Sequence, residues 1–468
     1  MATEKKRVLI PIVGQGSITH IIRSGILTQL KAFCNPIILL LWEQDDLIYQ
    51  LESEGYEVFI MPKYSVSANY TKIRGKINYW YQHFRLKSSS TKIQSNFNKK
   101  ISQGQFNIKS ILKKRLLWLS FRINPFYIKR LIALEESIIK EEQIYQKYNE
   151  WIDNLRGQGI FTVTPFLHEV ELVARLLKRK NGLLMSSIHS FDNITKRGWP
   201  AIFFDEYFVW NKYNKSELER INPDFKTENI IKITGAPQFD FHFDEAFCWS
   251  KQEWLKKLSL PEGKKIVLYA GGAANILPKE PQYLKHLVTA IEEDGNSSDV
   301  IILFRCHPLD KVTRWKENIG EAPFLYYDYK IPVDRKLDYN NFSIDEIRML
   351  VSTLKYTDVH ISVCSTMTID GSVFNKPQIA PYYDEESEAS EILLREIYHQ
   401  EHYLPIVNSG VLNFAYNKQE LFEIVTKALS SPNSFNKNCK LCLKETITFT
   451  DGRSSERVIS QIKKIITK

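Results

Sequence analysis

Long apolar stretches are missing from this chain of 468 residues. No apolar run reaches the roughly 20 residues that a membrane-spanning helix needs, and the amino-terminal sequence lacks the apolar segment and cleavage site of a signal peptide. We therefore expect a cytoplasmic protein. The composition, 43% hydrophobic and 25% charged, is typical of globular proteins. At this length the default is two or three domains.

Cysteine pairs and catalytic signature motifs are scarce as well. Among six cysteines only Cys439 and Cys442 have C-x-x-C spacing, and no second pair completes a zinc site. We predict that all six are reduced and structural. The chain has no G-x-x-x-x-G-K-[ST] loop and no D-x-D pair, which argues against a P-loop kinase or ATPase and gives no reason to expect a metal.

Acidic residues are missing from one long segment, which we call the basic segment. Residues 63–134 contain 16 Lys and Arg but no Asp or Glu, so the rest of the chain carries 47 basic and 54 acidic residues. Aromatic and aliphatic side chains are interleaved with the charges, most densely in residues 115–134. This mixture suits an anionic bilayer surface better than nucleic acid. We predict that the basic segment binds the inner face of the cell membrane as a peripheral attachment.

Apolar strands alternate with helical stretches in the first half of the chain, as in a parallel α/β sheet. Strands are predicted at residues 8–13, 36–42, 57–61, 161–164, 183–189, 201–204, 207–210 and 230–234. Residues 135–155 are predicted as one charged helix, and residues 88–91 and 96–105 as loops. Gly14 and Gly16 follow the first strand, but the third glycine of a dinucleotide-binding fingerprint is missing.

The alternation breaks at residues 235–238, where we predict a domain boundary, and then resumes. Three later strands, at residues 265–270, 299–305 and 359–363, end in residues suited to an anionic ligand. Gly271-Gly272 permit close backbone approach, Cys306-His307-Pro308 present an imidazole, and Ser365-Thr366 present hydroxyls at a helix start. Each feature is also an ordinary turn or helix cap. Ligands of open parallel sheets bind beyond the carboxyl ends of the strands, so together they predict a nucleotide-phosphate site.

These features resemble those of GT-B glycosyltransferases, in which two Rossmann-like domains face each other across a cleft. Cys306-His307-Pro308 resembles the HP motif of bacterial polysialyltransferases, Kdo transferases and CDP-glycerol glycerophosphotransferases. Ser365, Thr366, Asp370, Lys376 and Pro377 match the S-S/T-x-x-x-D…K-P pattern of the same enzymes. Residues 451–457 and 190–198 are similar to segments of capsule, teichoic-acid and other surface-polysaccharide enzymes. The resemblance runs from about residue 181 to the end of the chain.

The resemblance implies a donor site built around a phosphate. His307 would contact the donor's phosphate, and Ser365 and Thr366 would hold the same group, which stabilises the charge on the departing nucleotide. Asp370 would either reach a ribose hydroxyl or orient the loop. The predicted donor-binding set is Gly271, Gly272, His307, Pro308, Ser365, Thr366 and Asp370.

The acceptor hydroxyl needs a general base on the opposing domain. His20 is the first candidate, because GT-B transferases of the G-H-x-x-P type carry their catalytic histidine just after the first strand. This sequence has Thr19 in place of the glycine and lacks the proline. Asp192 is predicted as a second catalytic residue. Further candidates at strand ends of the first domain are His189, His168 and Glu169.

The sequence thus predicts an α/β protein of the GT-B class. Residues 1–235 would form the acceptor domain, residues 236–445 the nucleotide-donor domain and residues 446–468 a closing helix. The predicted function is transfer of a sugar from a nucleotide-activated donor to a surface polysaccharide, such as capsule or lipopolysaccharide, or to a lipid-linked glycan. No metal, other cofactor or nucleic-acid partner is expected. The alternatives are a CDP-glycerol glycerophosphotransferase-type polymerase, a UDP-sugar 2-epimerase and a non-catalytic nucleic-acid-binding protein.

Overall fold

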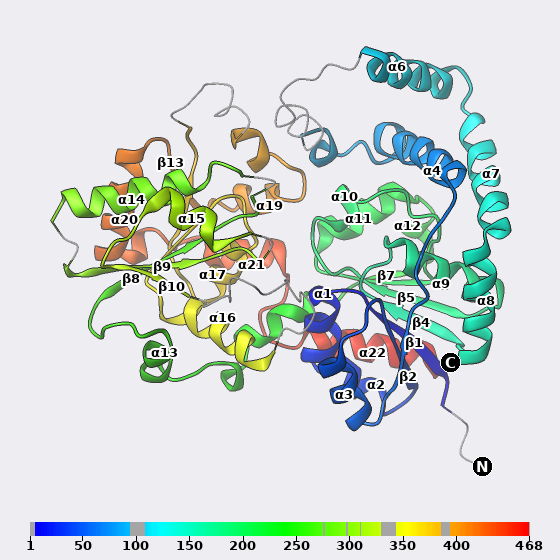
Figure 1. The fold of residues 1–468 in the computed structure, drawn as a ribbon, viewed down its shortest axis with the longest axis horizontal. Helices are drawn as coiled ribbons and strands as arrows, with labels where there is room; N and C mark the ends of the chain where they lie inside the picture. Colours follow the sequence, from blue (N-terminus) through cyan, green and yellow to red (C-terminus); the bar gives the residue numbers. More distant parts are fainter. Residues whose placement is uncertain are drawn as a thin grey trace. The chain divides into compact units, whose positions relative to one another are not determined.

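The computed structural model of the chain describes residues 5–93, 108–274, 277–295, 298–308, 310–328, 343–384 and 394–467. The chain divides into two compact units, residues 1–235 with 455–468, and residues 236–454. Each unit contains one parallel sheet with helices packed against it (Figure 1). The chain therefore passes between the units twice, after Gly235 and after Ser454.

The first unit is built on a seven-stranded sheet in which all neighbouring strands are parallel. Its strands are β1 (Arg7–Ile12), β2 (Asn35–Leu40), β3 (Glu57–Ile60), β4 (Gly159–Thr162), β5 (Leu183–Ser187), β6 (Glu206–Val209) and β7 (Ile231–Ile233). Their order across the sheet is β3-β2-β1-β4-β5-β6-β7, so the direction of winding reverses between β1 and β4. Leu9 and Ile10 face opposite sides of β1 and both are buried. This two-sided burial explains the continuous apolar run of the strand.

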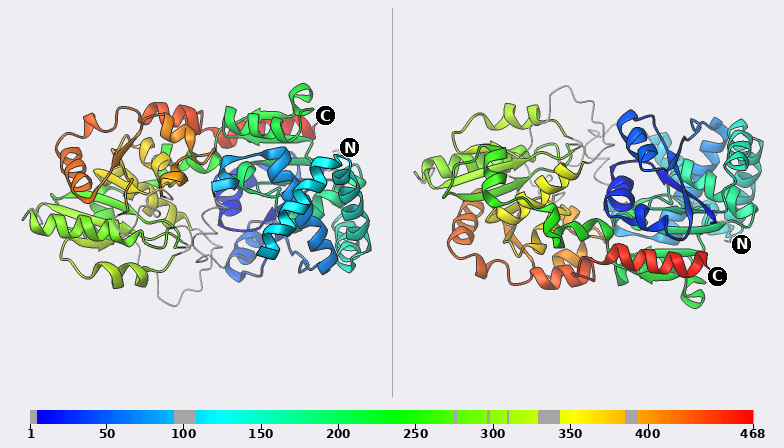
Figure 2. Two further views of the ribbon diagram at one scale, coloured as in Figure 1. Left: turned by 90° about the horizontal axis from the view of Figure 1, so that it is seen from above. Right: turned by 90° about the horizontal axis from the view of Figure 1, so that it is seen from below.

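Helices cover both faces of this sheet. They are α1 (Gln15–Ser17), the π-helix η1 (Ile18–Arg23), α2 (Ile26–Leu30), α3 (Asp45–Ser53), α4 (Ala68–Trp80), the π-helix η2 (Tyr81–Leu86), α6 (Ile108–Ile123), α7 (Tyr127–Glu141), α8 (Gln143–Leu155), α9 (His168–Arg179), α10 (Asn193–Lys196), α11 (Lys212–Ile221), α12 (Phe225–Glu228) and α22 (Ser454–Ile466). Helix α22 contributes Val458 and Ile462 to the same buried cluster as Ile10. Figures 1 and 2 show it, in red, beside the sheet of the first unit.

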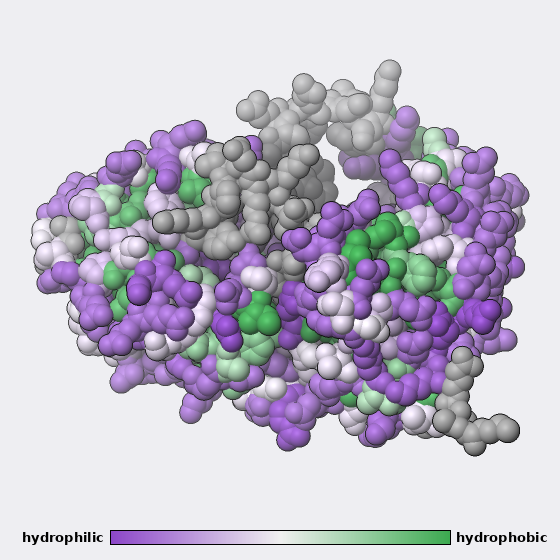
Figure 3. Space-filling view, turned by 60° about the horizontal axis from the view of Figure 1, so that its bottom comes forward, coloured by the Kyte–Doolittle hydropathy of each residue, from purple (hydrophilic) through white to green (hydrophobic). Residues whose placement is uncertain are grey.

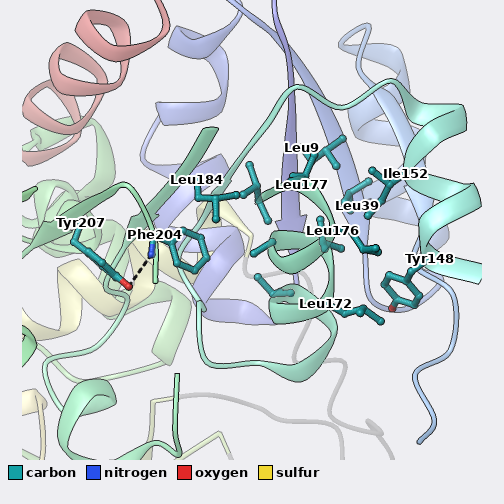
Figure 4. Close-up of a cluster of buried hydrophobic side chains, with 14 of the residues drawn as sticks. Leu9, Leu39, Tyr148, Ile152, Leu172, Leu176, Leu177, Leu184, Phe204 and Tyr207 are labelled. Carbon is teal, nitrogen blue, oxygen red and sulfur yellow. Dashed lines mark hydrogen bonds between the residues drawn. The ribbon is translucent and has the colours of Figure 1, made fainter. Parts of the chain in front are cut away.

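Aliphatic side chains of α8 and α9 fill the other face of the sheet. Leu172, Leu176 and Leu177 of α9 lie in one buried cluster with Ile152 of α8 and Leu9 of β1 (Figure 4). Residues 170–177 of α9 are all buried, so the helix packs against other parts of the unit on more than one side.

The strand predicted at residues 201–204 does not form. These residues lead into β6, and the Phe204 N–H donates a hydrogen bond to the Tyr207 hydroxyl (3.1 Å) instead of to a neighbouring strand (Figure 4). The apolar residues that suggested a strand are used in packing, since Phe204 is buried in the core of the unit. The apolar run at residues 201–204 therefore indicated packing against the core correctly, but the strand predicted from it is wrong.

The basic segment contributes helices to the first unit, and α4 packs beside α7 (Figure 1). Four buried charges join these helices to α9: Arg74 and Arg175 pair with Glu135 and Glu171. Burial raises the pKa of Glu171 to about 7, and Arg74 opposes this shift. Every charge has an opposite partner in the cluster, so none is buried alone. Residues 89–93 are helical rather than the predicted loop, and residues 96–105 lie outside the described part of the chain.

The single helix predicted at residues 135–155 is wrong, because two helices share this stretch. Helices α7 and α8 are separated by Glu142, whose backbone is extended (φ −68°, ψ 136°). The Glu142 carboxylate accepts a hydrogen bond from the Ser67 N–H just before α4. A contact 75 residues away in sequence thus stabilises the break, and local helix propensity does not reveal it.

The second unit is built on a six-stranded sheet, also entirely parallel. Its strands are β8 (Lys265–Ala270), β9 (Val300–Arg305), β10 (Leu325–Tyr327), β11 (Val359–Ser362), β12 (Gln378–Pro381) and β13 (Leu412–Ala415), in the order β10-β9-β8-β11-β12-β13. The winding reverses between β8 and β11. The sequence predicted β8 and β12 with these bounds but missed the two edge strands, β10 and β13, which are short and only partly buried.

Helical segments surround this second sheet. They are the 3-10 helices η3 (Pro237–Phe243) and η4 (Glu245–Phe247), α13 (Lys251–Leu258), α14 (Pro281–Glu293), α15 (Val312–Ile319), α16 (Ile344–Tyr356), α17 (Met367–Val373), α19 (Leu404–Asn408), α20 (Lys418–Ser430), the 3-10 helix η6 (Pro432–Ser434) and α21 (Cys439–Thr446). All six cysteines are free thiols, as predicted.

The described helices are too short or too polar to cross a bilayer. On the face shown in Figure 3, hydrophilic residues predominate and apolar residues form small separate areas.

Candidate functional site

Three neighbouring strands of the second unit end side by side. In the register of the sheet, Ala270 at the end of β8 pairs with Arg305 of β9 on one side and with Ser362 of β11 on the other. The turns that follow these strands therefore leave the same edge of the sheet at the same level. They also flank the reversal between β8 and β11, the position at which open α/β sheets bind ligands. The predicted residues Gly271, His307 and Ser365 all lie in these turns.

The two glycines after β8 make room for other residues of the protein. A Cβ atom at Gly271 would lie 2.6 Å from the Trp315 ring, and one at Gly272 would lie 2.8 Å from Oε2 of Glu280. The Gly272 N–H donates to that same oxygen (2.7 Å). Tight internal packing thus accounts for both glycines, and their predicted approach to a ligand stays a prediction.

Glu280 is a buried carboxyl group directly behind this turn. Its Oε1 has no partner among the residues that the structure describes, and its exposed fraction is 1%. Burial raises its pKa to about 8, while the bond from Gly272 opposes the shift. A carboxyl group in these surroundings is protonated at neutral pH, so Glu280 holds the turn without placing a negative charge beside it.

The turn that carries His307 is held by Asp310. The Asp310 N–H donates to the His307 carbonyl (2.9 Å), and the buried carboxylate accepts from Trp315 Nε1 (2.8 Å) and from Arg314. Arg314 also donates to the Pro278 carbonyl (2.8 Å) and so joins the turns after β9 and β8. His307 itself stays partly exposed, and Pro308 beside it is exposed. Burial lowers the pKa of His307, with Asp310 opposing, which favours a neutral imidazole.

Ser365 and Thr366 lie in a tight turn between β11 and α17. Cys364 has a positive φ of 45°, a conformation that L-residues rarely adopt and that is over-represented at functional sites. The Ser365 hydroxyl accepts from the Met367 N–H (3.2 Å), while Thr366 is exposed. Helix α17 has only seven residues, and Asn375, two residues beyond its end, has the left-handed conformation. The case for a phosphate here therefore rests on the neighbouring side chains more than on the helix dipole.

Asp370 points toward another part of the same unit. Its Oδ1 lies 2.6 Å from Nε2 of His242 in η3. Of the two roles that the sequence left open for Asp370, this bond favours orientation of the loop.

In the first unit, the predicted base His20 is fully buried. It lies in η1, and its Nε2 is 2.9 Å from the Ser187 hydroxyl at the end of β5. The ring is thus part of the packed interior at the carboxyl edge of the sheet, which leaves an acceptor no direct access to it.

His189, two residues after β5, is half-buried at the same edge. Its ring centroid is 6.2 Å from that of His20, and a Cβ at Gly16 would lie 2.3 Å from its Nε2. Gly16 is therefore required by His189, which explains the Gly-x-Gly turn without a dinucleotide. Burial lowers the pKa of His189 to about 4, with Asp192 opposing, so the imidazole is neutral at physiological pH.

Asp192 is also partly exposed near this edge. The Ser190 hydroxyl donates to its Oδ1 (2.5 Å), and Lys196 lies 3.5 Å from Oδ2. Of the other candidates, His168 begins α9 and stacks on Tyr64 at 5.8 Å, and burial lowers its pKa. Within the described ranges, no group of three or more His, Cys, Asp and Glu residues has the arrangement of a metal site.

The sequence did not single out the residues that hold the site together: Glu280, Asp310, Arg314 and His242. Their partners are backbone groups or side chains up to 128 residues away, so no short motif marks them. The one available signal was the spacing of Asp310 and Arg314, which is that of an i,i+4 ion pair on a helix.

The two parallel α/β units have the GT-B fold. Solved structures with this fold include S. aureus MnaA in complex with UDP (11% identity, covering 99% of this chain and 97% of that chain, TM-score 0.55). A glycosyltransferase from Rickettsia africae matches at 14% identity (99% of both chains, TM-score 0.50). The wall teichoic acid polymerase TagF matches at 12% identity (99% of this chain, 90% of that chain, TM-score 0.51). At such identities the likeness establishes the fold, as predicted.

The chain belongs to the CDP-glycerol:poly(glycerophosphate) glycerophosphotransferase family, whose sequence model matches residues 203–464. It is therefore a transferase that uses a nucleotide-activated donor, which confirms the predicted class of function. The match covers the second unit and leaves the basic segment outside. No curated protein matches the chain by sequence.

Proposed function

We propose that this transferase moves a sugar or a glycerol phosphate from a nucleotide-linked donor onto a polymer of the cell surface. The observation that carries the proposal is the alignment of three strand ends in the second unit, which brings the turns of His307 and Ser365-Thr366 to one edge. An imidazole and two hydroxyls supply hydrogen bonds to a phosphate. Family membership makes CDP-glycerol the first donor to test, and the predicted nucleotide sugar is the second.

Both reactions build negative charge on the same kind of group. The acceptor's hydroxyl oxygen forms the new bond and its proton passes to a base. With a nucleotide sugar, the bond from the anomeric carbon to phosphate oxygen breaks, and the nucleotide leaves with both electrons. With CDP-glycerol, the phosphoanhydride P–O bond breaks and CMP leaves. In either case His307, Ser365 and Thr366 would stabilise the charge on the departing phosphate.

The acceptor side would lie in the first unit, with His189 as the proton acceptor. The sequence favoured His20, but the structure buries His20 against Ser187 and leaves His189 partly exposed. The His189 imidazole is neutral and can accept a proton, but burial makes it a weak base, and the charge of Asp192 opposes that effect. His20 would then support His189 by packing beside its ring. Asp192 would help to orient the loop that follows His189, through its hydrogen bond with Ser190.

Helices α6 and α7 would hold the protein at an anionic membrane. Leu116, Ile123 and Phe126 expose 64%, 80% and 66% of their surface, although each is a large apolar side chain. Exposed Lys and Arg side chains lie among them, while Phe121 and Leu131 are buried against α4. Apolar side chains flanked by cations are the pattern of helices that lie in the headgroup layer.

Nucleotide release tests the proposal directly. We expect the wild-type protein to release CMP from CDP-glycerol, or a nucleotide from UDP-N-acetylglucosamine or a CMP-sugar, only when a glycerol phosphate or glycan primer is present. Product without a primer would indicate a 2-epimerase. EDTA should leave the rate unchanged, because the reaction is predicted to need no metal.

The substitution His307→Ala should lower kcat by about 100-fold to 1,000-fold, since it removes one preorganised donor at the leaving group. A matched control is Asn413→Ala, which removes two hydrogen bonds to backbone carbonyls of the same unit, one of them at the start of β12. Unchanged activity of the His307→Ala protein would overturn the donor site.

A further inference from the structure

His242 and Asp370 form a short buried hydrogen bond within the second unit. Nε2 of His242 lies 2.6 Å from Oδ1 of Asp370, and 2% of the His242 side chain is exposed. A carboxylate only accepts hydrogen bonds, so Nε2 carries the hydrogen. Nδ1 is buried without a partner among the described residues. The Nε2–H of His242 is thus directed at Asp370.

The His242 ring also touches the far end of the same helix. Its centroid is 5.8 Å from that of Phe374, which follows α17, and 5.5 Å from that of Phe239. His242 therefore contacts α17 at two points, by a hydrogen bond in the first turn and by ring packing at the last. These two contacts connect η3 to both ends of a short helix, which also packs against β11, β12 and α21.

The segment that carries His242 is itself held by contacts that do not involve α17. Phe241 packs with Ile347 and Val351 of α16. Oδ1 of Asp240 accepts from the Ser454 N–H (3.0 Å), at the point where the chain leaves the second unit. Because η3 has these independent anchors, it can serve as the fixed support against which α17 is positioned.

Helix α17 depends on such support. A helix of seven residues has little stability of its own, and the Thr366 side chain makes no cap hydrogen bond. The turn with Ser365 and Thr366 continues directly into this helix. A rotation or shift of α17 would therefore displace both hydroxyls from the phosphate that they are proposed to bind.

We propose that His242 is a positioning residue of the donor site: through Asp370 it holds the turn that presents Ser365 and Thr366. The inference rests on the proposed function of these two hydroxyls. It assigns to residues 237–243, which carry no chemistry of their own in the transfer, the task of keeping the donor-binding helix in place.

Two substitutions separate the hydrogen bond from the ring. His242→Phe keeps an aromatic ring beside Phe374 but removes the N–H to Asp370. His242→Gln loses the ring but keeps an N–H at nearly the position of Nε2. We expect His242→Phe to raise the donor KM by about tenfold or more, with a smaller change in kcat, because a misplaced contact weakens binding of the charged group. His242→Gln should recover most of this loss, and Asn413→Ala serves again as the control with unchanged donor KM.

A role in packing alone predicts the opposite ranking, with His242→Gln impaired and His242→Phe close to wild type, and this result would overturn the proposal. Thermal unfolding of each variant shows whether it is folded. The double variant His242→Phe with Asp370→Ala should be no worse than the worse of the two single variants, since both break one interaction. Additive losses would count against the coupling.

Binding of CDP-glycerol and UDP-N-acetylglucosamine to Ser365→Ala and Thr366→Ala distinguishes failure of the proposed donor site from failure of the proposed role of His242. If the hydroxyl variants bind both nucleotides like wild type, the proposed donor site fails and this inference fails with it. If they bind at least tenfold more weakly while His242→Phe binds normally, only the role of His242 is wrong.

Discussion

The carboxyl edges of the two sheets share an architecture but place their polar side chains differently. In the second unit, buried partners such as Glu280 and Asp310 hold the turns, while His307 and Thr366 remain accessible. In the first unit the imidazoles are drawn inward, with His20 fully buried and His189 packed over Gly16. Under the proposed function, the first arrangement would serve to bind a phosphate group and the second to transfer a proton. Repeating a fold therefore does not repeat a site.

The units also differ in the surface that they present. Among the described residues, most of the exposed large apolar side chains belong to the first unit: Tyr49, Ile60, Leu112, Leu116, Leu119, Ile123, Phe126 and Leu134. In the second unit they are Ile344, Tyr416 and Leu441, which are far apart in the sequence. The concentration on α6 and α7 is the observation behind the proposed membrane surface, since singly scattered apolar residues need no explanation.

The sharpest test of the comparison replaces each of the two histidines of the first unit in turn. We expect His189→Ala to lower kcat by about 100-fold to 10,000-fold, because it removes the general base, and to leave the donor KM unchanged. His20→Ala should cost less than about tenfold in kcat. Nucleotide release with a saturating primer measures both effects, and His399→Ala is a matched control on the surface of the second unit.

The reverse order, with His20→Ala nearly inactive and His189→Ala active, would restore the base favoured by the sequence. It would also show that the buried His20 becomes accessible during the reaction.

A second test concerns the surface of α6. Replacing Leu116 and Ile123 together by Glu should reduce binding to vesicles of anionic lipid by well over tenfold, because burial of each side chain contributes roughly 1.5–3 kcal/mol and the new charges are repelled. Sedimentation with vesicles at low and high salt measures the effect. Tyr49→Glu, on α3, is the control with an equally exposed side chain. Failure of the wild-type protein to bind anionic vesicles at low salt would remove the membrane proposal.

The smallest expected effect concerns the neutral carboxyl of the second unit. The pKa of Glu280 is raised by burial to about 8, from an ordinary value of 4.5. Between these values the unfolded chain has released a proton that the folded protein keeps, so this group lowers the free energy of unfolding as the pH rises from 4.5 to 8. Glu280→Gln removes the titration but still accepts from Gly272.

The variant should therefore gain stability relative to wild type between pH 5 and pH 8, by roughly 4 °C or more in the melting temperature of the second unit. Melting curves at several pH values measure the difference. Glu262→Gln, on an exposed loop, should track the wild type throughout. A constant difference between Glu280→Gln and wild type would mean that the carboxyl is already ionised at pH 5.

Much of the fold was visible in the sequence, because apolar runs of five or six residues between turn residues identify buried strands. Strands β8 and β12 were predicted with their observed bounds, and the parallel α/β class followed from the alternation. The failures have two causes. The break at Glu142 and the edge strands β10 and β13 depend on contacts with distant residues, whereas Phe204 makes a local bond to Tyr207 in place of a strand pairing.

The candidate site divides in the same way. Its chemical groups, His307, Ser365 and Thr366, could be predicted because they follow predicted strands and match the HP and S-S/T-x-x-x-D…K-P patterns in order and spacing. Which strands lie next to one another was not readable, because β8 pairs with a strand that follows it after 29 residues and with another that follows after 88. Sheet order is set by packing of the whole unit, and local sequence does not encode it.

By itself, the sequence determined the components of this transferase: two sheets, a basic segment with interleaved apolar side chains, and polar residues at the ends of particular strands. The tertiary structure alone decided which of those residues meet, which histidine is accessible and which buried groups hold the turns in place. The physical reason is that hydrophobic pattern and turn chemistry are properties of neighbouring residues. Burial, pKa and hydrogen-bond partners are properties of the surroundings, which exist only once residues such as His242 and Asp370 have been brought together.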